Sequence, residues 1–468
     1  MKRRYLPLVS LFFIAPLLVS CLSNDDEETI VYNDAAITSF SIKTLKRVVH
    51  TKSKSGADSS YVVNFPASDY HFYINQLTRE IYNPDSLPLG IDASKVLATI
   101  TTKNAGVLGV KNVANDSVKF YKATDSLDFV QPRQIVVYNQ AGTALATYKI
   151  HVNVHREAPD VFKWSQPVKQ QSALGALTGM RVIVNNGRLY VFGTEGEHAK
   201  LYTATTKSGA DWHELSTNVP LSAQAWQNVA LMGHTFYVYN NGVLLSSADA
   251  QNWQKVANVA LKHLVGATEN KLYALSSKGQ LVVSTNQGKS WTRENLDKQE
   301  GQLPQKDFSL LVLPVKTNRG VNRLFLGGTT DKNNCLWSKI DDAAPNAEQQ
   351  PWTFFSQRSA DRYALPNMNH LQVVKNGDAL IAMGGAGMGE SSAVQPFAQF
   401  YRSIDGGLSW HQYGNLTFPK DFQSSATSFA MASDENHYLW LICGKTGQVW
   451  KGRFNELGWK KVQKSFTE

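Results

Sequence analysis

The side chains best suited to recognising a ligand lie in three separate stretches of the chain. The first holds two glutamates and a histidine, the second a tryptophan, and the third two arginines, a tyrosine and a histidine. Aromatic rings stack on sugar rings, and charged groups form directed hydrogen bonds with polar substituents. This combination predicts a site for a polar, ring-shaped ligand. The alternative is that each residue packs in the core or forms a surface ion pair. The candidates are Glu195, Glu197, His198, Trp226, Arg358, Arg362, Tyr363 and His370.

No motif for a reaction, a metal or a cofactor accompanies these candidates. The histidines are scattered, and neither a His-x-Glu-x-x-His run nor an Asp-x-Asp-x-Asp-Gly loop occurs. Cys335 and Cys443 are far apart, so we expect buried free thiols, with a disulfide as the alternative. The formal net charge is +9, but after the basic start at residues 2–4 no basic run is longer than the pair Lys460-Lys461, so no nucleic-acid partner is expected.

A turn motif recurs in the second half of the chain. Its clearest copy is the eight-residue segment from Ser403 to Trp410, and two further copies keep its hydroxyl, glycine and tryptophan. Hydroxyl and Asp/Asn side chains satisfy backbone N–H groups of a tight turn, glycine supplies a positive φ, and tryptophan packs on the turn. A segment from Ser246 to Trp253 keeps only the ends. The residues predicted to be structural are Ser284, Asn286, Gly288, Trp291, Ser403, Asp405, Gly407, Trp410, Thr205, Gly209 and Trp212.

A short strand with alternating aromatic residues precedes each turn, as in residues 188–191, 235–238 and 438–441. The tryptophans that follow recur at intervals of ~40–60 residues, which is the length of a four-stranded propeller blade. We therefore predict an all-β fold with a six-bladed β-propeller over residues 160–468. The strand beginning at Trp164 would be an extra outer strand or part of ring closure, and seven blades are the alternative count.

The turn at Ser403 to Trp410 resembles the Asp-box of the bacterial-neuraminidase-repeat (BNR) propellers, which include sialidases. This resemblance implies a structural turn on the rim away from the usual binding face. Sialidases also share an Arg-Ile-Pro segment and three arginines that hold the substrate carboxylate. Arg181 lies in a first-blade strand, but its neighbours Gly179-Met180-Arg181-Val182 lack that segment and no arginine triad is evident. A sialidase is therefore not expected.

The preceding region, residues 31–156, has a different texture. The chain has 468 residues, of which 43% are hydrophobic and 18% charged, so composition excludes a disordered chain and leaves room for a second folded domain. Short β-branched or aromatic runs predict an Ig-like β-sandwich, followed by a linker over residues 155–160. The expected strands are residues 37–45, 61–65, 71–74, 96–101, 118–121, 133–138 and 144–154.

The first twenty residues have the pattern of a signal peptide, with a basic start at residues 2–4 and an apolar run over residues 6–18. The ending Leu18-Val19-Ser20-Cys21 resembles the bacterial lipobox, which implies cleavage before Cys21 and a lipid on its thiol. The acidic run at residues 24–28 resembles the export signal of Bacteroidetes surface lipoproteins. Residues 21–30 would then be an acidic tether and the protein an outer-membrane, surface-exposed lipoprotein. The alternatives are an ordinary signal peptide and a merely flexible tether.

The segment over residues 82–90, with the propeller behind it, resembles a family of Bacteroidetes surface lipoproteins known only as domains of unknown function. That resemblance brings no activity. Three function classes stay open: a non-catalytic surface lipoprotein that binds a glycan or protein, a carbohydrate-active hydrolase of unrecognised type, and an accessory subunit of an outer-membrane transport complex. The first is favoured because no catalytic constellation is visible in the sequence.

Overall fold

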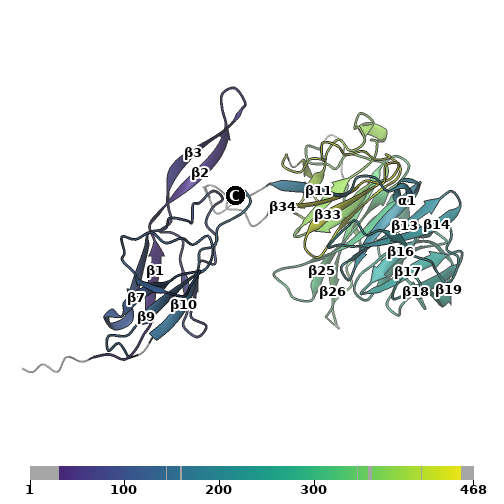
Figure 1. The fold of residues 1–468 in the computed structure, drawn as a ribbon. Helices are drawn as coiled ribbons and strands as arrows, with labels where there is room; N and C mark the ends of the chain where they lie inside the picture. Colours follow the sequence, from purple (N-terminus) through teal and green to yellow (C-terminus); the bar gives the residue numbers. More distant parts are fainter. Residues whose placement is uncertain are drawn as a thin grey trace, which may run out of the picture. The chain divides into compact units, whose positions relative to one another are not determined.

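The computed structural model describes residues 31–143, 145–158, 161–344, 346–356, 361–412 and 414–454. Cys21, the signal peptide and the acidic tether lie outside these residues. The chain divides between residues 158 and 159 into two compact units, and each is described by itself (Figure 1). Within the described ranges, no helix has the length and apolarity needed to cross a membrane.

The N-terminal unit is all-β. One six-stranded sheet has the order β4-β5-β10-β9-β7-β8, in which β5 and β10 are parallel, and two further ladders pair β1 with β6 and β2 with β3. Buried apolar side chains such as Ile81, Val96 and Ile135 form its core. Its elements are β1 (Ile37–Ile42), β2 (Thr44–Lys52), β3 (Asp58–Pro66), β4 (Tyr73–Asn75), β5 (Glu80–Tyr82), β6 (Ala98–Thr102), η2 (Lys103–Ala105), β7 (Val107–Lys111), β8 (Val118–Phe120), β9 (Arg133–Tyr138) and β10 (Leu145–His151).

The C-terminal unit contains six four-stranded antiparallel sheets within the described residues, here called blades one to six. Blades one to three comprise β12 (Gly179–Asn185), β13 (Arg188–Glu195), β14 (His198–Thr205) and β15 (His213–Glu214); β16 (Val229–Met232), β17 (Thr235–Asn240), β18 (Val243–Ser247) and β19 (Gln254–Asn258); and β20 (Leu261–Ala267), β21 (Leu272–Ser276), β22 (Leu281–Ser284) and β23 (Thr292–Arg293).

Blades four to six comprise β24 (Lys306–Pro314), β25 (Val321–Thr329), β26 (Asn334–Asp342) and β27 (Thr353–Phe354); β28 (Gln372–Asn376), β29 (Ala379–Met383), β30 (Tyr401–Ser403) and β31 (His411–Gln412); and β32 (Phe429–Ser433), β33 (Tyr438–Cys443), β34 (Val449–Phe454) and β11 (Phe162–Val168). The short helices are α1 (Ser172–Gly175), η3 (Ala225–Gln227), η4 (Glu300–Gln302) and η5 (Gly389–Ser391).

The ring closes where the first strand of the unit joins its last blade. Trp164 lies in β11, which pairs antiparallel with β34 as the outermost strand of blade six. The sequence predicts either an extra outer strand or part of ring closure for this segment, and the pairing of β11 with β34 shows that it closes the ring. Ser428, just before β32, also donates a hydrogen bond to the carbonyl of Leu177, just before β12, at 2.6 Å. The two ends of the propeller are therefore fastened together on both its outer and inner sides.

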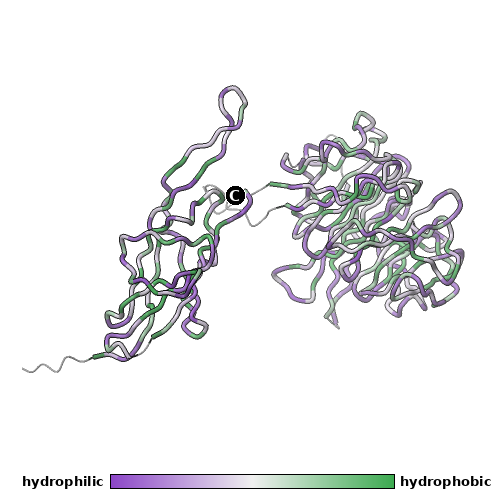
Figure 2. The backbone as a smooth tube through the Cα atoms, in the orientation of Figure 1, coloured by the Kyte–Doolittle hydropathy of each residue, from purple (hydrophilic) through white to green (hydrophobic). Residues whose placement is uncertain are grey.

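Hydrophobic side chains pack between adjacent blades, and Figure 2 shows apolar strands concentrated inside the propeller with polar connections around them. Cys335 and Cys443 are both buried free thiols in this packing. Burial raises the pKa of Cys335 to about 11 and that of Cys443 to about 12, so neither is a thiolate at neutral pH.

The repeated turns join the third and fourth strands of their blades. In blade five, Ser403 donates to Asp405 at 2.7 Å and accepts from the backbone of Gly407 at 2.8 Å. Asp405 also accepts from the backbone and hydroxyl of Ser409, and the indole of Trp410 donates to the Gly407 carbonyl at 3.1 Å. Blade three repeats this network with Ser284, Asn286, Gly288, Ser290 and Trp291. These hydrogen bonds are those expected of a structural turn.

Two other copies of the turn differ from the pattern predicted from the sequence. In blade two, the hydroxyl is Ser247 rather than Ser246, and it donates to Asp249 at 2.9 Å. The turn is one residue shorter there, and Ala250 at φ +61° occupies the left-handed position that glycine takes elsewhere. In blade one, Thr205 and Trp212 flank an acid after all, because Asp211 accepts from the Thr205 hydroxyl at 3.1 Å. A fixed-spacing comparison missed both acids because the side chains reach the turn from shifted positions.

Candidate functional site

A channel of about 560 Å³ lies between the innermost strands of the six blades. Successive blade strands are antiparallel, so the starts of these innermost strands share one face with the links between second and third strands. The repeated turns lie on the opposite face. The mouth formed by the strand starts, here called the channel mouth, is therefore separate from the Asp405 type of turn.

All six blades contribute a polar or aromatic side chain to the upper part of the channel. Each lies within three residues of the start of an innermost strand, so the ring itself brings together positions far apart in sequence. These residues are Arg181, Trp226, His263, Asp307, His370 and Thr427. This arrangement is a mixed polar and aromatic cavity of the kind that binds small ligands.

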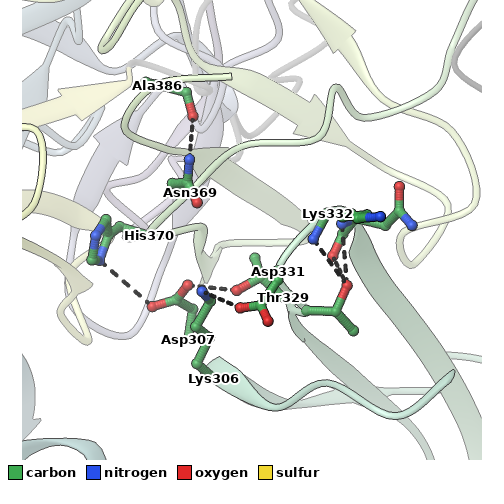
Figure 3. Close-up of polar contacts among 10 residues, drawn as sticks. Lys306, Asp307, Thr329, Asp331, Lys332, Asn369, His370 and Ala386 are labelled. Atoms are coloured by element: carbon green, nitrogen blue, oxygen red, sulfur yellow. Dashed lines mark hydrogen bonds and ion pairs between the residues drawn. The ribbon is translucent and has the colours of Figure 1, made fainter. Parts of the chain in front are cut away.

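Asp307 and His370 face each other across the gap between blades four and five (Figure 3). Their carboxylate oxygen and Nδ1 are 3.8 Å apart, and the Thr329 hydroxyl donates to the other Asp307 oxygen at 2.6 Å. Both residues have left-handed backbones, with φ of +57° and +52°. Asp and His tolerate this region better than most residues, yet it still costs free energy, and such strain concentrates at functional sites.

The surrounding loops hold this pair in place. The backbone N–H and side-chain amide of Asn369 both donate to the carbonyl of Ala386, which anchors the long loop between β29 and β30 beside His370. On the other side, Lys306 pairs with Asp331 at 3.1 Å, as Figure 3 also shows. The edge of the channel mouth is thus fixed by contacts within blade five and within blade four.

Arg181 reaches across the channel from blade one to blade four. Its guanidinium donates to the backbone carbonyl of Phe308 at 2.8 Å. Desolvation by the enclosing walls lowers the pKa of Arg181 to about 10, against the opposing effect of the Asp307 carboxylate. Arg181 is therefore charged at neutral pH and forms a cationic floor below the channel mouth.

His263 lines the same cavity, 5.4 Å from the ring centre of Phe308. Its Nδ1 is buried and has no hydrogen-bond partner among the described residues. Burial, assisted by the charge of Lys262, lowers the pKa of His263, so the ring is neutral at physiological pH. A buried ring nitrogen without a hydrogen-bond partner lowers the stability of the fold. The channel therefore contains a second feature, after the left-handed backbones of Asp307 and His370, that costs folding free energy.

Of the candidates predicted from sequence, Trp226 and His370 lie at the channel mouth. The half-buried Trp226 rests on Gly179, where a Cβ would approach its ring to 2.5 Å, so glycine at this position seats the indole. Glu197 and His198 instead line a smaller pocket of about 240 Å³, which Trp226 also borders. Glu195 is exposed on the same turn of blade one. Two of the three predicted stretches therefore meet around Trp226.

The third stretch is divided. Tyr363 is exposed and lies against His411 with ring centres 4.3 Å apart, while its carbonyl accepts from the backbone of Trp410. Tyr363 therefore lies beside the blade-five turn and β31, away from His370 at the channel mouth. The guanidinium of Arg362 lies over the Tyr363 ring at 5.2 Å. Arg358 lies outside the described residues.

Sequence reasoning missed Asp307 and His263, and it weighed Arg181 only as a sialidase arginine. Their common signal is position: each begins or just follows the start of the strand that precedes an aromatic second strand. Aligning the blades on their second strands would have placed these three residues at equivalent positions near the start of each innermost strand. In the part of the chain that the structure describes, no cluster of three or more metal-ligating side chains is found.

Two family models cover most of the chain. The DUF6242 beta propeller domain matches residues 158–462, and the domain of unknown function (DUF6242) N-terminal domain matches residues 40–152. No curated protein is significantly similar in sequence.

Several solved structures are distantly similar. The GH74 enzyme of Niastella koreensis is 16% identical with a TM-score of 0.32; the match covers 76% of this chain but only 47% of the enzyme, so this chain spans about half its length. YCF48 from Cyanidioschyzon merolae is 14% identical (TM-score 0.34, covering 62% and 98%). The Trichoderma reesei Carbohydrate-Active Enzymes Family AA12 protein is 12% identical (TM-score 0.40, covering 64% and 97%). At these values none of them indicates an activity for this chain.

Proposed function

The chain belongs to the DUF6242 family, whose name assigns no activity, and from its own geometry we propose that it is a non-catalytic, ligand-binding propeller lipoprotein. The observation that carries this proposal is the channel mouth, where every blade supplies at least one polar or aromatic group to a 560 Å³ cavity. A sugar unit suits this site, because Trp226 offers a ring face while Asp307 and His370 offer hydrogen bonds to hydroxyls.

Binding without turnover is favoured over glycoside hydrolysis by the number of carboxylates. A glycosidase of either stereochemical class needs two carboxyl groups ~5–10 Å apart across the bond to be cut. Among the described residues that line the channel, Asp307 is the only carboxylate. The channel can therefore orient a sugar but lacks the acid and base pair that would cleave it.

The cellular address is part of the same proposal. A lipid on Cys21 would hold the protein on the outer membrane, with residues 21–30 as a tether and an Ig-like N-terminal domain as a spacer that precedes the propeller in the chain. The hydrogen bonds of the blade-three and blade-five turns support their assignment as Asp-boxes, with six blades in the ring. Cys21→Ala should release the protein from the membrane fraction, and retention of that variant would contradict the anchor.

The binding proposal is tested by closing the channel mouth. A panel of immobilised glycans should retain the protein, and incubation of each hit should yield no cleavage product. Thr427→Trp adds a large ring at the exposed edge of the channel and should abolish retention without changing the melting temperature. The matched control Ser277→Trp adds the same ring on the same face outside the channel. Retention by Thr427→Trp, or cleavage of a hit, would overturn the proposal.

A further inference from the structure

The charges around the channel are unbalanced. Three cations, Arg181, Lys306 and Lys375, line it against the single carboxylate of Asp307. Of these cations, Lys306 is already paired with Asp331 at the edge of the channel mouth, and Lys375 lies near the end of β28, away from the mouth. His263 is neutral and adds no charge. The cation below the mouth without an ion pair is therefore Arg181.

The guanidinium of Arg181 has more hydrogen-bonding capacity than the protein uses. It carries five N–H donors, and its one hydrogen bond to the described residues goes to the Phe308 carbonyl. Asp307 influences it at longer range, but its carboxylate is held by Thr329 and His370. An enclosed cation without an anion is costly, and a planar guanidinium binds a carboxylate through two parallel hydrogen bonds.

The groups above Arg181 limit which anion fits. Asp307 repels a doubly charged group, such as a phosphate monoester, more strongly than a single carboxylate, and it accepts a hydrogen bond from a hydroxyl. Trp226 offers a ring face at the same level. A sugar unit that satisfies all three has one carboxylate, neighbouring hydroxyls and a ring with an apolar face.

We propose that the channel mouth binds an acidic sugar whose carboxylate lies on Arg181 and whose hydroxyls meet Asp307 and His370. This inference rests on the proposed binding function and specifies its ligand class. It also assigns Arg181 as the residue that selects acidic over neutral sugars.

A double comparison of protein charge and ligand charge tests this assignment. The probes are a galacturonate trisaccharide and its methyl ester, which keeps the sugar rings but removes the negative charges. The proteins are the wild type and two variants. Arg181→Met removes the positive charge but keeps a side chain of similar length, and Arg181→Lys keeps the charge but loses the planar guanidinium that can donate two parallel hydrogen bonds. Affinities are measured by calorimetry, and melting temperatures verify that each variant is folded.

The wild type should bind the acid at least about 30-fold more tightly than the ester, the range expected for one charge-assisted pair. Arg181→Met should abolish this preference, and Arg181→Lys should restore part of it. If Arg181→Met fails to fold, the wild-type ratio still decides, and a ratio near one overturns the inference. A preference that survives in folded Arg181→Met would place the carboxylate elsewhere and overturn it as well.

The remaining outcomes separate this inference from the proposed function. If only neutral glycans bind and Thr427→Trp blocks them, the binding function stands and the acidic ligand is wrong. If a triglutamate peptide binds in an Arg181-dependent way while no acidic sugar does, the ligand class is wrong. If none of these ligands binds, the acidic-sugar proposal fails together with the binding function.

Discussion

Asp405 at the rim and the Arg181–Asp307 region in the channel use charged side chains in opposite ways. Asp405 accepts hydrogen bonds from Ser403, Leu408 and Ser409, all within its own turn. Arg181 crosses to another blade and leaves most of its donors without a protein partner. A charge satisfied by its own turn stabilises that turn, whereas a charge that stays unpaired in a cavity is available to a ligand.

The largest expected loss of stability tests the rim. Trp410 is 2% exposed and donates its indole N–H to the turn, so Trp410→Ala empties a packed site and should reduce the free energy of unfolding by about 3–5 kcal/mol. The exposed neighbour Tyr363 is the matched control, because Tyr363→Ala should cost less than about 0.5 kcal/mol. Chemical denaturation measures both. Ligand affinity of Tyr363→Ala also tests the sequence prediction that this ring contacts ligand.

The next largest effect concerns the carboxylate itself. Asp405→Ala removes the acceptor for the N–H groups of Leu408 and Ser409, and should cost about 1 kcal/mol, as losses of comparable capping groups do. Ligand binding at the opposite face should be unchanged. A variant that keeps its stability but loses binding would show that the turns belong to the site, and the contrast between the two faces would be wrong.

A substitution in the channel should change the free energy of unfolding in the opposite direction. Arg181→Met replaces an enclosed, unpaired cation with an apolar chain of similar length, so stability should be unchanged or raised by about 1 kcal/mol while ligand selectivity is lost. A gain in stability with a loss of ligand selectivity is expected when a residue serves ligand binding more than folding. A loss of more than about 2 kcal/mol in denaturation would instead make Arg181 a structural tie between blades one and four.

The same two regions explain what the sequence could predict. The turn residues are local, so the spacing from Ser403 to Trp410 was sufficient to predict the hydrogen-bonded turn that they form. In blade two, a one-residue deletion with Ala250 in the left-handed position broke that spacing and concealed Asp249. The channel residues Arg181, His263 and Asp307 come from three blades, and nothing near each of them in sequence points to the others. Ring closure brings these three residues to the same channel, and only the assembled fold shows this.

The smallest expected effect is the pH dependence of the rim. Desolvation alone would raise the pKa of Asp405, but hydrogen bonds from Ser409 and Ser403 outweigh it and hold the pKa below its usual value. A lowered folded pKa stabilises the protein above the unfolded value of about 3.9, and this contribution is lost as the pH falls through the folded value. The stability difference between wild type and Asp405→Asn should therefore be constant from pH 5 to 7 and shrink below about pH 4.

Because Asp405 is exposed, solvent screening should keep this change below about 1 kcal/mol. Urea denaturation of both proteins at pH 3.5, 5 and 7 measures it. Arg181→Met is the control, because an arginine with a pKa of about 10 keeps its charge across this range and should give a difference that does not vary with pH. A gap between wild type and Asp405→Asn that widens toward acid would mean that the turn binds the protonated carboxyl better. The hydrogen bonds from Leu408, Ser403 and Ser409 would then not be what stabilises the rim.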